Sequence, residues 1–189
     1  MKLTKIAAGG GLTGDDLRLV FDRAVLAAKD VFDRTQIGEK SISIVSLAVR
    51  KMLAKAPDKS ARVLLIGAGQ TNNLVAKFLR KYGYTNVAVF NRSLGRAEQL
   101  AATFSGGSAF PLAELADYSM GFDVLYVCTA ATESVVNQKN IGSLLAGETA
   151  SGKLLIDLAV PNNVAEAVVE SHAFHYISVD HLRQLADET

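Results

Sequence analysis

Residues 62–93 read RVLLIGAGQTNNLVAKFLRKYGYTNVAVFNRS. A short apolar run ends at the glycine turn Gly67-Ala68-Gly69, and an amphipathic helical pattern follows it as far as Gly83. A second apolar run, residues 87–90, leads into Asn91-Arg92-Ser93. This order of strand, glycine turn, helix and strand is typical of the βαβ unit that binds a dinucleotide.

Each position of the turn has its own physical requirement. Gly67 permits a tight turn off the strand, and Gly69 lets the backbone approach a pyrophosphate at the positive end of the helix. The third position of the fingerprint is usually Gly or Ala, and here it is Asn72. The predicted phosphate-binding residues are Gly67, Ala68, Gly69, Gln70, Thr71 and Asn72. The alternative is a tight turn in an α/β protein that binds no ligand.

The end of the second strand indicates which dinucleotide is bound. An NAD site places Asp or Glu about 20 residues after the glycines, to bind the ribose 2′-hydroxyl. Here that place holds Asn91, followed by Arg92, Ser93 and, one turn later, Arg96. No carboxylate repels a 2′-phosphate, a guanidinium can bind one, and Ser93 can also cap the next helix. We expect NADP(H) as the cofactor; the alternative is a solvated helix start.

Composition excludes several classes of protein. The chain has 189 residues, a formal net charge of +1 and one cysteine. The charge gives no general attraction to nucleic acid or membrane, and the single cysteine suits a reducing, cytoplasmic compartment. No apolar stretch is long enough to span a bilayer.

The remainder of the chain alternates short apolar runs with helical patterns. Further strands are predicted at residues 108–110, 124–128, 154–156 and 175–178, with helices or short helical turns between them and a closing helix to Asp187. With right-handed crossovers this pattern predicts an α/β fold: a doubly wound parallel (Rossmann) sheet of order 3-2-1-4-5-6.

A helical extension precedes the predicted sheet. Helices are expected over Thr13–Arg34 and, after a break at Gly38, over Ser41–Lys55. The second has one apolar face formed by Ile42, Val45, Val49 and Met52. We therefore divide the chain into a flexible start (residues 1–12), a helical connector (13–56) and the NADP-binding domain (57–189).

Ligands of such sheets lie across the carboxyl ends of the strands. Cys128 ends the fourth predicted strand and is followed by Thr129, Ala130 and Ala131, whereas Asp157 to Pro161, including Val160, follow the fifth. These residues are therefore predicted near the nicotinamide. Thr129 can bond the carboxamide or the ribose. Cys128 has no neighbouring base and more simply acts as a small apolar residue. No catalytic residue or metal ligand is predicted: His172, His175 and His181 lack partners arranged as a metal site.

Taken together, these motifs resemble the glutamyl-tRNA reductase family, within the wider group that includes shikimate and quinate dehydrogenases. The matching residues are Gln36-Ile37-Gly38 with Ser41-Ile42-Ser43, Leu65-Ile66-Gly67-Ala68-Gly69 with Leu74-Val75-Ala76-Lys77, Asn91-Arg92-Ser93 with Arg96-Ala97-Glu98, Cys128-Thr129-Ala130, Ile156-Asp157-Leu158-Ala159-Val160-Pro161, and Tyr176-Ile177-Ser178-Val179-Asp180-His181-Leu182. Asn162 stands where the family often has a basic residue.

The resemblance implies an oxidoreductase that uses NADPH to reduce glutamyl-tRNA to glutamate-1-semialdehyde in tetrapyrrole (porphyrin) biosynthesis. In that family an N-terminal domain carries a cysteine nucleophile that accepts the glutamyl group, and a C-terminal helical domain dimerises. We expect this chain to be the central NADPH-binding domain, inactive alone, with glutamyl-tRNA and a homodimer partner belonging to the longer protein. No direct nucleic-acid contact is expected of this part. The alternatives are a shikimate-dehydrogenase-like NADP oxidoreductase and a non-catalytic nucleotide-sensing module.

Overall fold

The computed structural model describes residue 23 and residues 36–187. Its elements are α3 (Gln36–Lys55), β1 (Val63–Ile66), α4 (Gln70–Lys81), β2 (Val87–Asn91), α5 (Leu94–Ala101), β3 (Ser108–Pro111), the 3-10 helix η1 (Leu112–Ala116), β4 (Val124–Val127), α6 (Ile141–Leu145), β5 (Leu154–Asp157), α7 (Glu166–Ser171), β6 (His175–Ser178) and α8 (Val179–Asp187). The helix predicted over Thr13–Arg34 lies outside the described residues, apart from Arg23.

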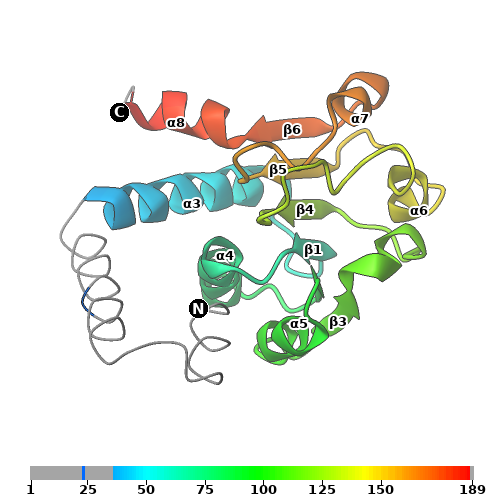
Figure 1. The fold of residues 1–189 in the computed structure, drawn as a ribbon, viewed down its shortest axis with the longest axis horizontal. Coiled ribbons are helices and arrows are strands. Elements are labelled where there is room, and N and C mark those ends of the chain that lie inside the picture. Colours follow the sequence, from blue (N-terminus) through cyan, green and yellow to red (C-terminus); the bar gives the residue numbers. More distant parts are fainter. Residues whose placement is uncertain (1–22, 24–35, 188–189) are drawn as a thin grey trace, which may run out of the picture. The chain divides into compact units, whose positions relative to one another are not determined.

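The six strands form one parallel sheet of order β3-β2-β1-β4-β5-β6, which confirms the predicted fold and strand order. Contacts within the chain separate residues 1–41 from a compact unit formed by residues 42–189. Figure 1 shows α3, α4, α5 and α8 on one side of this sheet and α6 and α7 on the other. The four central strands, β2, β1, β4 and β5, are therefore covered on both faces, as their apolar sequences require.

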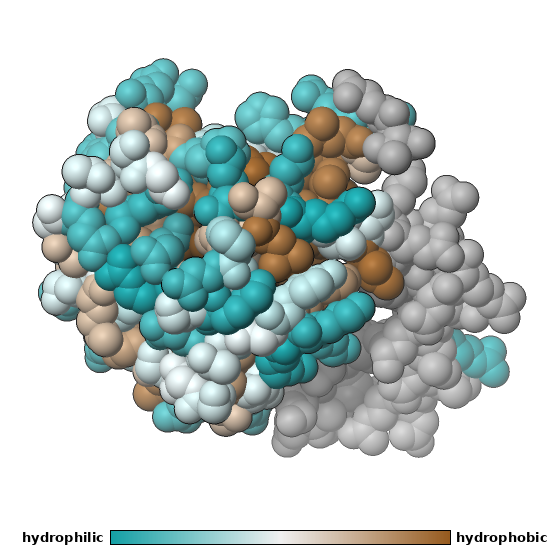
Figure 2. All heavy atoms as spheres, turned by 180° about the vertical axis from the view of Figure 1, so that it is seen from behind, coloured by the Kyte–Doolittle hydropathy of each residue, from teal (hydrophilic) through white to brown (hydrophobic). Residues whose placement is uncertain are grey.

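Alternate residues of the strands supply two separate apolar layers. Val63 and Leu65 of β1 pack with α3, α4, α5 and α8, whereas Leu64 and Ile66 pack with η1, α6 and α7. The period of two along a strand accounts for this division. Hydrophilic side chains cover most of the coloured surface in Figure 2, and hydrophobic ones reach it only in patches.

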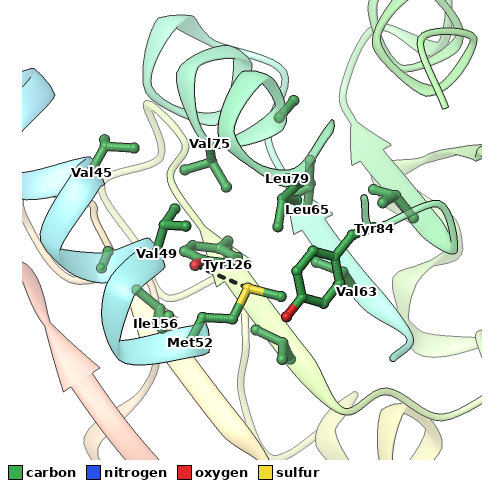
Figure 3. Packing of buried hydrophobic residues seen from close by; sticks show 14 of the residues in the cluster. Val45, Val49, Met52, Val63, Leu65, Val75, Leu79, Tyr84, Tyr126 and Ile156 are labelled. Atoms are coloured by element: carbon green, nitrogen blue, oxygen red, sulfur yellow. Dashed lines mark hydrogen bonds between the residues drawn. The ribbon is translucent and has the colours of Figure 1, made fainter. Parts of the chain in front are cut away.

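Helix α3 belongs in part to the first of these layers. Val45, Val49 and Met52 are buried, and the Tyr126 hydroxyl donates to the Met52 sulfur at 3.4 Å (Figure 3). Ile42, predicted on the same face, is instead 52% exposed, because it lies a full turn before the part of the helix that reaches the sheet.

The predicted break at Gly38 is wrong, since α3 runs continuously from Gln36. A single glycine inside a helix costs only about 1 kcal/mol relative to alanine, which a long helix tolerates. Strand ends differ from the prediction by one residue: β4 ends at Val127, one residue early, whereas β2, β3 and β5 end one residue late, at Asn91, Pro111 and Asp157. No helix among residues 36–187 is long and apolar enough to cross a membrane.

A charged cluster joins the amino ends of β1, β4 and β5. Arg62 bridges Asp123 at 2.8 Å and Glu148 at 2.7 Å, and the nearly buried Lys153 also pairs with Glu148. Hydrogen bonds from Arg62 and Lys153 lower the pKa of Glu148 to about 2. The cluster therefore connects three strands by paired charges at the edge opposite to the glycine turn.

Met52→Ala should lower the free energy of unfolding by about 2–5 kcal/mol, because it leaves a cavity under α3. Ile42→Ala, on the same helix, is the matched control and should change it by less than about 1 kcal/mol. Urea denaturation followed by circular dichroism measures both. Equal losses would show that the exposure of Ile42 is wrongly assigned.

The depressed pKa of Glu148 predicts a defined pH dependence. Because the folded value lies below the ordinary 4.5, ionised Glu148 stabilises the fold above that pH, and this contribution disappears as the pH falls toward about 2. Glu148→Gln should therefore lose less stability than the parent chain between about pH 5 and about pH 2 in urea titrations. Glu133→Gln, an exposed loop position, should follow the parent curve; the same curve for Glu148→Gln would contradict the prediction.

Candidate functional site

The candidate site lies where β1 and β4, neighbours in the sheet but far apart in sequence, end side by side. Ile66 of β1 is in register with Val127 of β4 and with Phe90 of β2, and Val127 is in register with Asp157 of β5. The loops that follow these strands consequently meet at one edge. This is the switch point at which ligands of open α/β sheets bind.

Gly67 occupies the tightest place at this edge. Its φ is +101°, and a Cβ on it would lie 2.2 Å from the carbonyl oxygen of Cys128. The chain is held there by backbone bonds: the Gly67 N–H donates to Phe90 O at 2.7 Å, and the Cys128 N–H donates to Ile66 O at 3.0 Å. Only glycine satisfies both the dihedral angle and the contact.

Gly69 immediately precedes α4 and faces open space. Its backbone is extended, and a Cβ on it would have no neighbour within 4 Å. Among the described residues, no protein acceptor is found for the N–H groups of Gly69 and Gln70. Unpaired N–H groups at the positive end of a helix are suited to bind an anion.

Asn72 occupies the third position of the fingerprint and makes hydrogen bonds to the backbone of the turn. Its side chain is fully buried, and Nδ2 donates to the carbonyl oxygens of Ile66 at 2.9 Å and Gly67 at 2.8 Å. Glycine or alanine allows close packing here, whereas asparagine instead fixes the turn by capping the end of β1. Its Oδ1 has no partner among the described residues.

The residues after β2 surround one rim of the site. Asn91 Oδ1 accepts the Ala68 N–H at 3.1 Å, and its Nδ2 donates to Ser93 O at 3.0 Å, so this side chain connects the glycine turn to the next loop. Arg92, Ser93 and Arg96 are exposed. Ser93 is the N-cap residue of α5, as expected, although its side chain makes no capping bond.

The opposite rim is organised by Asn163, which sequence reasoning missed. This fully buried amide accepts both the Thr129 N–H (2.9 Å) and the Thr129 hydroxyl (2.7 Å), and it donates to Ala131 O at 3.2 Å. The Thr129 hydroxyl also accepts the Ala131 N–H at 3.1 Å. Its own hydrogen points to Asn163 and not into the cavity. No sequence motif marks Asn163, because its partners lie on a loop 34 residues away in the sequence.

Two further titratable groups lie near this rim, the half-buried Cys128 and the fully buried Asp157. Burial raises the pKa of the Cys128 thiol, whose Sγ lies 3.5 Å from Leu158 O, so the thiol is neutral at neutral pH. Burial also raises the pKa of Asp157, whose oxygens accept the N–H groups of Ala159 (3.0 Å) and Val164 (2.9 Å). Asp157 thus shapes the loop that carries Val160.

A cavity of about 500 Å³ extends between the two rims. It is lined by Gly67, Ala68, Gly69, Gln70, Thr71, Asn91, Arg92, Ser93, Arg96, Leu112, Cys128, Thr129, Ala130 and Ala131. Of the predicted site residues, only Asn72 and those from Asp157 to Pro161 are not among them: Asn72 lies buried beneath the turn, and Val160 is 68% exposed on its loop. Leu112 is a lining residue that was not predicted. The cavity is a suitable cradle for an extended ligand with a central anionic group.

Comparison with known proteins identifies the family. Residues 47–185 match the family model described as shikimate/quinate 5-dehydrogenase. The chain is 34% identical over 178 residues to the glutamyl-tRNA reductase of Idiomarina loihiensis, an alignment that covers 93% of this chain and 41% of that protein. The chain thus spans about two-fifths of the length of the curated relatives it matches.

Solved structures agree in fold. The glutamyl-tRNA reductase of Methanopyrus kandleri superposes with a TM-score of 0.67 at 33% identity, covering 99% of this chain and 47% of that one. A structure of the nucleotide-binding domain of the Thermoplasma volcanium glutamyl-tRNA reductase gives a TM-score of 0.57 at 20% identity, covering 77% of this chain and 92% of that one. At that identity the second comparison supports the fold alone.

Gly67→Ala should destabilise the fold by about 2–4 kcal/mol, because it combines a positive φ with a clash against fixed backbone. Gly69→Ala should change the free energy of unfolding by less than about 1 kcal/mol, since its Cβ would point into open space. Denaturant titration of the two variants checks this contrast. A stable Gly67→Ala protein would refute the close approach of the two loops.

Proposed function

Because the chain belongs to the shikimate/quinate 5-dehydrogenase family, we propose that it is the NADPH-binding domain of a glutamyl-tRNA reductase. The longer protein would reduce glutamyl-tRNA to glutamate-1-semialdehyde in tetrapyrrole biosynthesis. The observation that carries the proposal is the 34% identity to a glutamyl-tRNA reductase across 93% of this chain. The cavity between the β1 and β4 loops is independent support.

The residues of the cavity fit a nicotinamide dinucleotide. Gly67 brings the turn against the end of β4, and the bare backbone of Gly69 with the start of α4 would receive the pyrophosphate. The small side chains of Ala130 and Ala131 leave space for the flat nicotinamide ring at the opposite rim. When bound there, the cofactor supplies the hydride. The protein's part is to orient the ring and to exclude water.

NADPH is favoured over NADH by the positive charge of the rim formed by the residues after β2. Asn91 stands in place of the usual carboxylate, and its amide is occupied by the two loops it connects. Arg92 and Arg96 both line the cavity, and neither makes an ion pair with another described residue. A 2′-phosphate would therefore meet two cations and the Ser93 hydroxyl instead of a negative charge.

The acyl chemistry belongs to other parts of the longer protein. Cys128 would not serve as the acyl acceptor, because burial raises the pKa of its thiol and nucleophilic attack requires the thiolate. The Thr129 hydroxyl is bonded to Asn163 and positions a loop. The acyl-accepting thiol and the dimer contacts would lie in the three-fifths of the relatives that the chain does not span, so the chain alone would bind cofactor without turnover.

A shikimate-dehydrogenase-like oxidoreductase is the second candidate, since the matching family model carries that description. The reductase is preferred because the relatives that match nearly the whole chain are glutamyl-tRNA reductases. Incubation with shikimate and NADP separates the two: formation of NADPH by this chain would favour the second candidate.

NADPH should bind this chain more tightly than NADH, and Arg92→Ala should weaken NADPH binding by about tenfold or more, because a charge-assisted hydrogen bond contributes about 1.5–3 kcal/mol. NADH binding should change little in the same variant. Isothermal titration calorimetry of both coenzymes against both proteins measures the preference.

Arg50→Ala, an exposed arginine on α3 outside the cavity, is the matched control and should leave both affinities unchanged. Equal affinities for the two coenzymes in the parent chain would contradict the assignment of NADPH. No binding of either would contradict the proposed function as a whole.

A further inference from the structure

The carboxyl end of β5 carries a fully buried carboxylate, that of Asp157, without a cation beside it. No ion pair joins Asp157 to another residue that the structure describes. At the opposite edge of the sheet, by contrast, the carboxylates of Asp123 and Glu148 are paired with Arg62. A buried charge without a counter-ion is costly for a fold, which makes Asp157 a candidate for a role in the site rather than in stability.

The groups around Asp157 suit an ionised carboxylate. Its Oδ1 accepts the Ala159 N–H at 3.0 Å, and its Oδ2 accepts the Val164 N–H at 2.9 Å. The N–H of Asn163 and the hydroxyl of Tyr176 are further donors that face it. Burial raises the pKa of Asp157, but all four hydrogen bonds act against that shift. Three of the four donors are backbone N–H groups, which cannot accept a hydrogen, so the carboxylate form fits this place.

Asp157 lies immediately behind the rim formed by residues 128–131, where the nicotinamide is proposed to bind. Asp157 is in register with Val127 of β4, and the next residue along the chain from Val127, Cys128, lines the cavity. The charge of Asp157 is close enough to contribute to the raised pKa of the Cys128 thiol. The rim residues have no acidic or basic side chain of their own. The field of Asp157 therefore reaches the cavity through protein rather than through water.

We propose that the Asp157 carboxylate stabilises the positive charge that the nicotinamide ring acquires when the cofactor gives up its hydride. The hydride, one proton with two electrons, forms a C–H bond at the acyl carbon of the substrate, whose bond to the acyl-accepting sulfur breaks with its electron pair. The ring thereby changes from neutral to positively charged. A fixed negative charge in a region poor in water stabilises that change without reorganising. The inference rests on the proposed function, because it requires the nicotinamide at the rim formed by residues 128–131.

The test compares NADP⁺ with NADPH by isothermal titration calorimetry of the 189-residue chain, which requires no turnover. The parent chain should bind NADP⁺ more tightly than NADPH, and Asp157→Asn should lower the ratio of the two affinities by about fivefold or more. A merely displaced loop would weaken both forms equally and leave the ratio unchanged. The matched control Glu133→Gln removes the same charge from an exposed position on the loop after β4. It should change the ratio by less than about twofold, because water and salt screen that charge.

The salt dependence of the parent chain keeps the test decisive if thermal melting shows that Asp157→Asn is unfolded. Because a buried charge is screened little, the preference for NADP⁺ should change by less than about twofold between about 0.05 M and about 0.5 M salt. Loss of the preference at high salt would assign it to exposed charges and overturn the inference. So would tighter binding of NADPH by the parent chain, or an unchanged ratio in folded Asp157→Asn. These results leave the proposed function intact, whereas failure of both coenzyme forms to bind would overturn the two together.

Discussion

The contact between Gly67 and the Cys128 carbonyl is the constraint on which the site depends. Parallel pairing of β1 with β4 brings the loops after these two strands to the same edge of the sheet. The short distance between the loops leaves no space for a Cβ on residue 67. The turn must therefore bend at once, which directs the next residues into α4 and leaves the N–H groups of Gly69 and Gln70 facing outward. The unpaired N–H groups that suit the cavity to an anion follow from this steric limit.

Three asparagines stabilise the loops around that contact. Asn72 caps the end of β1, Asn91 connects the glycine turn to the loop after β2, and Asn163 holds the loop after β4. Each amide offers both donors and an acceptor, so one side chain can satisfy backbone groups on two segments at once. The departure from glycine at position 72 is thus compatible with a dinucleotide site, because a buried amide replaces close packing by directed hydrogen bonds.

Charge is divided between the two edges of the sheet. At the amino ends of the strands, Arg62, Asp123, Glu148 and Lys153 neutralise one another and connect β1, β4 and β5. At the carboxyl ends and on the exposed face of α4, Arg92, Arg96 and Lys77 have no ion-pair partner among the described residues. Paired charges of the first kind contribute to the fold, whereas unpaired charges of the second kind favour anionic ligands.

The residues of the βαβ unit were predictable because local chemistry determines them. An apolar run, a glycine turn and an amphipathic helix each show in a short window, and parallel strands place their carboxyl ends together whatever the loops contain. For this reason nearly all the predicted cavity residues line the cavity. Asn163 was not predictable, because its role depends on the distance between two loops 34 residues apart. The exposure of Ile42 was likewise decided by packing. A helical pattern defines which residues share a face, but only the tertiary structure determines how far along that face the neighbouring element reaches.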